Sequence, residues 1–158
     1  MNKDIIKEYG DVLHDPSSIV DRPLEVLSVG PKLDIALGGG VPEGSLFIMT
    51  GPEKVGKTVT ALTFCANAQK HYQRKVYYAN IEGRLKKRDL EGIADLSLDS
   101  EEMQIIGSTE GNILSAEKYL SIVDNIVHTQ PGSLAVVDSF SALSSEAELT
   151  GDLSDMQV

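Results

Sequence analysis

The sequence feature that most constrains this chain is a glycine-rich loop, GPEKVGKT, at residues 51–58. It satisfies the pattern G-x-x-x-x-G-K-[ST], the Walker A phosphate-binding motif. An apolar run over residues 45–50 precedes the loop and predicts a short buried strand, and a helical pattern over residues 57–72 follows it. Strand, loop and helix in this order are the context that the motif requires.

The residue types in this loop predict how it would hold a di- or triphosphate. Gly51 and Gly56 permit backbone conformations closed to other residues, so the loop N–H groups can point inward at phosphate oxygens. Lys57 places a positive charge at the β- and γ-phosphates, and Thr58 offers a hydroxyl to Mg²⁺. The predicted binding residues are Gly51, Pro52, Glu53, Lys54, Val55, Gly56, Lys57, Thr58 and Val59.

Composition and charge narrow the class of protein. The 158 residues, 41% hydrophobic and 24% charged, are typical of one soluble globular domain, and no apolar run is long enough to cross a membrane. A single cysteine, Cys65, excludes an internal disulfide and fits a cytoplasmic protein, in which we expect it to be a small core residue. The net charge of −10 argues against a surface that simply coats nucleic acid.

Strand-like and helical patterns alternate along the chain. This alternation predicts an α/β fold with a mostly parallel sheet and flanking helices. We expect helices over residues 2–14, 31–37, 57–72, 85–93, 112–128 and 139–147, strands over 23–29, 45–50, 75–81, 102–106 and 134–138, and a tight turn over 41–44.

Acidic residues follow two of the expected strands. Asp138 ends the apolar run Leu-Ala-Val-Val, a Walker B pattern, and is expected to orient Mg²⁺ beside Thr58; the alternative is a helix cap. Glu82 follows the strand after the Walker A loop and is a candidate to activate water for attack on the γ-phosphate, although a turn residue would look the same. Ser139 either assists by hydrogen bonding or caps the next helix.

Several segments occur in an order that resembles the RecA-type recombinases, most similar to the phage (UvsX-like) branch. They are LDIALGGG at 33–40, P-x-G at 42–44, the loop at 51–58, Ile-Glu at 81–82 and Val-Val-Asp-Ser at 136–139. The resemblance covers most of residues 25–156. It implies a P-loop NTPase of RecA type: a Mg²⁺-dependent ATPase that forms filaments on single-stranded DNA and carries out strand exchange in recombination and repair.

The resemblance also assigns roles to particular residues and regions. It implies that Glu82 activates the attacking water, that Lys57 is catalytic, and that the cofactors are ATP with Mg²⁺ held by Thr58 and Asp138. Residues 1–24 would form a helical subunit-docking arm and residues 25–158 the ATP-binding core. A phage-encoded member would act in the host cytoplasm.

The segment from Gly83 to Leu90 corresponds to the region that approaches adenine in that family. Here it contains four basic residues, Arg84, Lys86, Lys87 and Arg88. They would stack on the base, touch phosphates across a subunit interface, or form a solvated helix face.

The chain ends at Val158, soon after the Walker B strand, whereas the family continues with further strands and two DNA-binding loops. We therefore expect a core that is incomplete at its C-terminus. The alternatives to an active ATPase core are a non-catalytic nucleotide-binding fragment that docks into a full-length recombinase, and another ATPase of the RecA superfamily.

Overall fold

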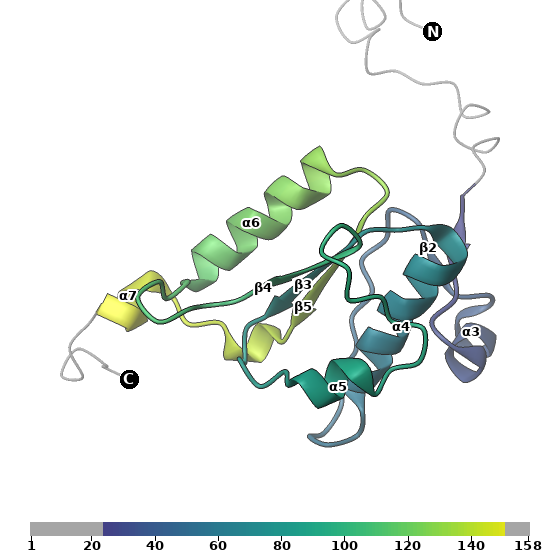
Figure 1. The fold of residues 1–158 in the computed structure, drawn as a ribbon, viewed down its shortest axis with the longest axis horizontal. Coiled ribbons are helices and arrows are strands. Elements are labelled where there is room, and N and C mark those ends of the chain that lie inside the picture. The colour runs from purple at the N-terminus through teal and green to yellow at the C-terminus, as the bar shows by residue number, and fades with distance from the viewer. Residues whose placement is uncertain (1–23, 151–158) are drawn as a thin grey trace, which may run out of the picture.

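Three parallel strands form the centre of the fold in a computed structural model that describes residues 24–150 (Figure 1). They are β3 (Val76–Asn80), β4 (Met103–Ile106) and β5 (Leu134–Asp138), in the order β4-β3-β5. Each was expected from its apolar run, and the α/β architecture with a parallel sheet agrees with the sequence prediction.

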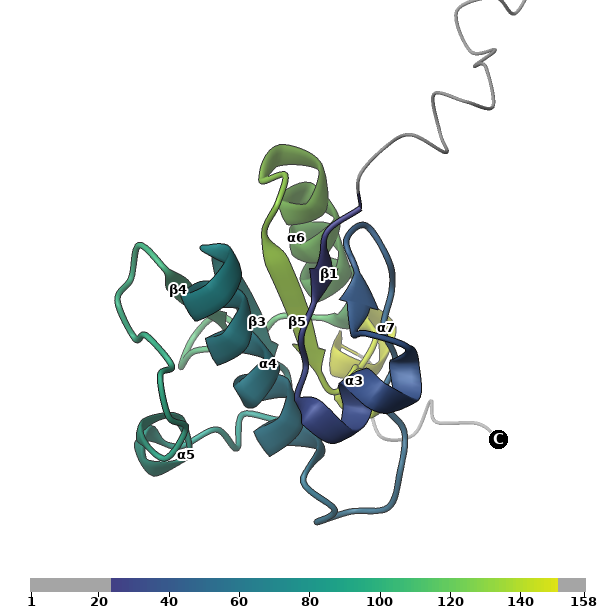
Figure 2. The ribbon, with the colours of Figure 1, turned by 90° about the vertical axis from the view of Figure 1, so that its right-hand side faces the viewer.

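Helices α4 (Lys57–Tyr72) and α6 (Ala116–Thr129) lie on opposite faces of this sheet (Figures 1 and 2). The small side chains of Ala61 and Cys65 let α4 approach the sheet closely, and together with Leu62 they pack in one buried cluster with Val76 and Tyr78 of β3. The prediction that Cys65 is a core residue is confirmed, because its side chain is fully buried.

Helix α6 begins four residues later than its apolar pattern suggested. Ser115 is the N-cap, and its hydroxyl oxygen accepts a hydrogen bond from the backbone N–H of Lys118 at 3.4 Å. Residues 112–115 therefore belong to the preceding loop. The helix buries Tyr119 and Ile126 on its inner side.

A small antiparallel pair, β1 (Val26–Leu27) with β2 (Val41–Pro42), flanks helix α3 (Pro31–Leu37). The strand expected over 23–29 is thus shorter, and part of the turn expected over 41–44 is its partner strand. Asp34 fixes this unit, since its carboxylate accepts hydrogen bonds from the Ser28 hydroxyl at 2.6 Å and the Val29 N–H at 2.8 Å. These bonds, the Ser28 contact first, lower the pKa of Asp34.

The buried strand predicted over residues 45–50 is wrong. No strand is assigned there, and the side chains of Leu46 and Ile48 are 83% and 69% exposed. A strand needs a neighbour to bond its backbone, and within residues 24–150 β5 pairs on one side only, with β3. Residues 45–50 therefore have an apolar sequence but no neighbouring strand within residues 24–150 to pair with.

The remaining elements are short. They are α5 (Lys87–Glu91), the 3₁₀ turn η2 (Phe140–Ala142) and α7 (Glu146–Thr150). The helices expected over 85–93 and 139–147 were therefore too long, and the second is split by non-helical residues. The helix expected over 2–14 lies outside the described residues. None of the helices within residues 24–150 is long and apolar enough to cross a membrane.

Candidate functional site

The glycine-rich loop leads directly into the N-terminus of α4. Gly56 is its N-cap and has φ +94°, a left-handed conformation that favours glycine. The first turn of α4 contains no acidic residue. Because the first N–H groups of a helix have no partner within the helix, this end carries free donors and a partial positive charge, which suits a phosphate.

Lys57 lies folded over the loop. Its Nζ donates hydrogen bonds to the carbonyl oxygens of Gly51 and Pro52, each at 2.8 Å. The ammonium group is thereby held beside the end of α4, so two sources of positive potential coincide at the loop.

Thr58 and Asp138 meet although 80 positions separate them in sequence. The Thr58 hydroxyl donates to Asp138 Oδ2 at 2.8 Å, joining the first turn of α4 to the end of β5. A hydroxyl and a carboxylate are hard oxygen ligands that suit Mg²⁺, which keeps several waters and usually takes few protein ligands. No cluster of three or more His, Cys, Asp or Glu side chains that could hold a metal occurs within the described residues.

Tyr78 also reaches Asp138, which the sequence analysis did not anticipate. Its phenol donates to the same Oδ2 at 2.6 Å. Burial, reinforced by the nearby carboxylate, raises the pKa of Tyr78, so the phenol stays a donor. The available signal was a tyrosine in a buried strand, because a buried phenol needs a hydrogen-bond partner.

Glu82 lies close to the same end of β5. The Ser139 hydroxyl donates to Glu82 Oε1 at 2.9 Å, so Ser139 uses its side chain for this contact and does not cap the following 3₁₀ turn. Arg84 approaches the other carboxylate oxygen, Oε2, at 3.6 Å. All the predicted catalytic and metal residues thus gather where the loop meets the carboxyl ends of β3 and β5.

The sequence matches the RecA N-terminal domain family over residues 3–158. The chain belongs to this family. Its parallel sheet flanked by helices is the α/β fold of a RecA-family domain.

Individual relatives support the same assignment. "Protein RecA" of Phytoplasma mali (strain AT) is 33% identical over 164 residues, covering 99% of this chain and 44% of that protein. "Protein RecA" of Streptomyces venezuelae is 38% identical over 139 residues, covering 87% and 34%. The "DNA repair protein recA homolog 3, mitochondrial" of Arabidopsis thaliana is 34% identical over 153 residues, covering 92% and 32%. This RecA-family chain spans less than half the length of these relatives.

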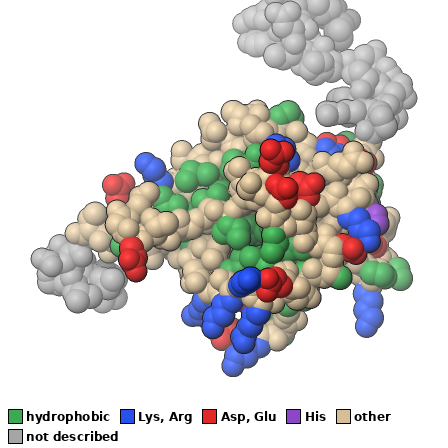
Figure 3. All heavy atoms as spheres, viewed as in Figure 1, with side chains coloured by type: hydrophobic (Ala, Val, Ile, Leu, Met, Phe, Trp, Pro, Cys, Tyr) green, Lys and Arg blue, Asp and Glu red, His purple; other side chains and the backbone are tan. Residues whose placement is uncertain are grey.

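The basic residues after Glu82 form an exposed margin of the RecA-family domain. Lysine and arginine side chains gather on the surface over α5 (Figure 3). Arg84, Lys87 and Arg88 are each at least 80% exposed, and Lys87 pairs with Glu91 at 3.4 Å. Stacking on a base, contact with phosphates across a subunit interface and a solvated face all need such exposed side chains, so the three interpretations stay predictions.

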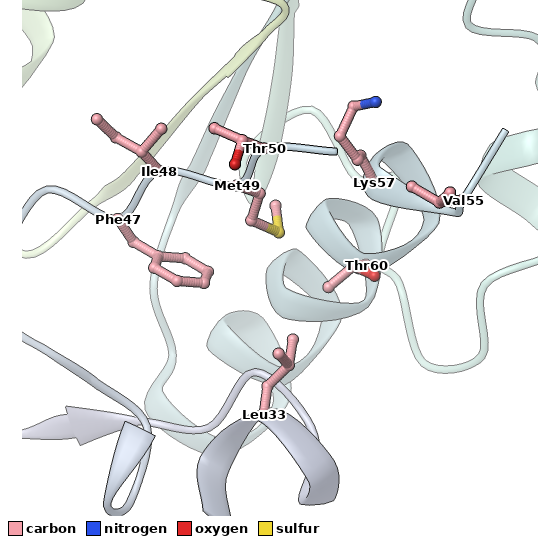
Figure 4. Close-up of a pocket in the computed structure, with 8 residues that line it drawn as sticks. All are labelled: Leu33, Phe47, Ile48, Met49, Thr50, Val55, Lys57 and Thr60. Atoms are coloured by element: carbon pink, nitrogen blue, oxygen red, sulfur yellow. The ribbon is translucent and has the colours of Figure 1, made fainter. Parts of the chain in front are cut away.

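An open hollow of about 360 Å³ lies beside the loop, between residues 47–50 and helices α3 and α4 (Figure 4). Apolar side chains dominate its wall, among them Leu33, Phe47 and Met49, while the Lys57 amine points away from it. Such a lining does not suit a phosphate. A phosphate would find hydrogen-bond donors at the loop N–H groups and not in this hollow.

Proposed function

We propose that this chain binds ATP with Mg²⁺ and hydrolyses it, as the nucleotide-binding core of a DNA recombination and repair protein. The observation that carries the proposal is the 2.8 Å contact between Thr58 and Asp138, located at the positive N-terminus of α4. It joins a Walker A hydroxyl to a carboxylate at a strand end, the pair that Mg²⁺ needs in P-loop NTPases.

In this proposal, residues 51–59 cradle the phosphates, Lys57 neutralises charge on the β- and γ-phosphates, and Thr58 with Asp138 holds Mg²⁺. Bound Mg²⁺ would supply charge neutralisation at the same phosphates. Glu82 accepts a hydrogen bond from the attacking water and takes its proton. The Ser139 hydroxyl, which donates to Glu82 at 2.9 Å, holds that carboxylate in one orientation.

Replacing the loop lysine tests nucleotide binding. We expect Lys57→Ala to weaken binding of a fluorescent ATP analogue at least about tenfold, because the charge beside the phosphates is lost. Lys70→Ala is the matched control, since Lys70 lies on the same helix but pairs with Asp95 on the surface. Failure of the wild-type chain to bind ATP would overturn the proposed function.

Replacing Glu82 separates binding from chemistry. We expect Glu82→Gln to lower the rate of ATP hydrolysis about 100-fold or more, because an amide cannot take the proton, while ATP affinity changes little. Measuring both the rate of phosphate release and the affinity for nucleotide distinguishes an effect on hydrolysis from an effect on binding. Glu91→Gln on the exposed side of α5 is the control. Equal loss of affinity and rate would assign Glu82 to binding and not to catalysis.

The DNA-linked part of the proposal rests on family membership and on the names of the relatives. We infer single-stranded DNA as a partner and filament formation as the working assembly. In a recombinase that carries this domain together with the DNA-binding loops, adding single-stranded DNA should raise ATP turnover, and Lys57→Ala should leave that protein inactive. If single-stranded DNA leaves the rate of ATP turnover unchanged, the proposal is restricted to nucleotide binding and hydrolysis.

The subtype and arrangement are further proposals. We assign the chain to the phage (UvsX-like) branch, acting in the host cytoplasm, with residues 1–24 as a subunit-docking arm and 25–158 as the ATP-binding core. The motif at 33–40 together with the loop at 51–58 motivates the subtype. A phylogenetic tree of the matched domain tests it, and grouping with bacterial proteins would contradict it.

A second candidate function is a nucleotide-binding component that joins another recombinase chain. One edge of β5 pairs with no strand within residues 24–150, and this edge together with the exposed side chains of Leu46 and Ile48 favours it. Mixing the chain with an intact recombinase should change filament assembly measured by light scattering, and Leu46→Asp should abolish the effect. No change over a wide concentration range would rule this function out.

A further inference from the structure

We propose that Tyr78 is a positioning residue for Mg²⁺ binding. Its hydroxyl fixes the Asp138 carboxylate through a direct hydrogen bond. The inference rests on the proposed function and deepens it, because it concerns the Mg²⁺ concentration that nucleotide binding requires.

Strand register brings the two side chains together. Tyr78 pairs with Val136, so Asp138 lies two residues farther along β5, and side chains two apart project from the same face of the sheet. The Tyr78 ring spans this diagonal, and its hydroxyl lies 2.6 Å from Asp138 Oδ2. Tyr78 is 0% exposed, so the phenol cannot exchange this partner for bulk water.

The contacts are unevenly divided between the two carboxylate oxygens. Oδ2 accepts from both Thr58, at 2.8 Å, and Tyr78, whereas Oδ1 accepts no hydrogen bond from residues 24–150. Two donors at one oxygen fix the rotation of the carboxylate. The other oxygen is thereby left to accept hydrogen bonds from metal-bound water, the role expected of this acid beside Mg²⁺.

Removing the phenol oxygen would leave Thr58 as the single side-chain donor to the Asp138 carboxylate among residues 24–150. Thr58 is itself a proposed metal ligand, so the carboxylate would then depend on a group whose own position changes with the metal. Tyr78 comes from β3, in the buried core, and so provides a support independent of the loop.

The test uses Tyr78→Phe in the full 158-residue chain and follows binding of a fluorescent ATP analogue, with no hydrolysis required. We expect the Mg²⁺ concentration for half-maximal enhancement of binding to rise about three- to tenfold, because a hydrogen bond to a charged group is lost. Nucleotide affinity in EDTA should stay within about twofold of wild type, since Tyr78 acts through the metal site.

Tyr77→Phe is the matched control, because the neighbouring ring points to the opposite face of β3 and makes no side-chain hydrogen bond within residues 24–150. Thermal melting of the metal-free proteins checks that all variants fold. In an Asp138→Asn background, Tyr78→Phe should have no further effect on the Mg²⁺ requirement.

The outcomes separate this inference from the proposed function. Absence of ATP binding by the wild-type chain would reject the proposed function. Mg²⁺-dependent binding that is identical in wild type and Tyr78→Phe would overturn the positioning role alone. So would an equal loss of affinity with Mg²⁺ and with EDTA, which would mark Tyr78 as a packing residue.

Discussion

At the residue scale, Gly40 occupies a position that no side chain fits. Its φ is +135°, and a Cβ would lie 2.3 Å from the carbonyl oxygen of Leu27. We expect Gly40→Ala to lower the free energy of unfolding by at least about 2 kcal/mol, because the backbone must move and β1 separates from β2. Urea denaturation measures the change.

Gly107 provides the control for this substitution. A Cβ there would meet its nearest neighbour, the Asn80 carbonyl oxygen, at an ordinary 3.8 Å. Gly107→Ala should therefore change stability by less than about 1 kcal/mol. Equal effects of the two substitutions would show that the contact with Leu27 does not constrain Gly40.

Cys65 makes stability depend on alkaline pH. Burial raises the pKa of its thiol from 9.0 to about 12. The unfolded chain therefore loses this proton first, so the contribution of the thiol is complete below about pH 9 and is lost as pH rises toward about 12. Between these limits we expect about 1.4 kcal/mol of lost stability per pH unit beyond that seen in Cys65→Ala. Urea unfolding at pH 8 and pH 10 measures the difference, and parallel losses in both proteins would contradict it.

At the element scale, helix α4 is buried against the sheet, whereas several side chains of residues 45–50 are exposed. Leu62 in α4 is fully buried, whereas Leu46 is 83% exposed. We expect Leu62→Ala to cost about 2–5 kcal/mol of unfolding free energy and Leu46→Ala less than about 0.5 kcal/mol. Urea denaturation at low protein concentration measures both.

The same pair of substitutions reports on association through residues 45–50. If Leu46→Ala were as costly as Leu62→Ala, residues 45–50 would be buried in solution against another chain. Sedimentation velocity would then show a species larger than the monomer, and Leu46→Ala would return it to the monomer.

At the scale of the whole molecule, local patterns predicted the fold and most of the site. The approach of Thr58 to Asp138 followed from the rule that parallel strands present their carboxyl ends at one edge. The prediction of a strand over residues 45–50 was wrong because an apolar sequence does not specify whether a neighbouring strand exists to pair with it. The contact of Tyr78 with Asp138 was missed because it depends on strand register, which the sequence does not show. Whether Ser139 bonds Glu82 or caps the next turn depends on its side-chain rotamer, which the sequence does not show either.

The contact between Thr58 and Asp138 also has a kinetic consequence. This contact closes a loop of 80 residues, and the entropy cost of closing it is offset only after β3 and β5 have paired. Helix α4 is instead stabilised largely by local hydrogen bonds. During refolding, helical circular dichroism should recover before the chain regains the ability to bind nucleotide with Mg²⁺. The metal site would then report the last stage of refolding, and stopped-flow traces of the two signals would resolve the delay.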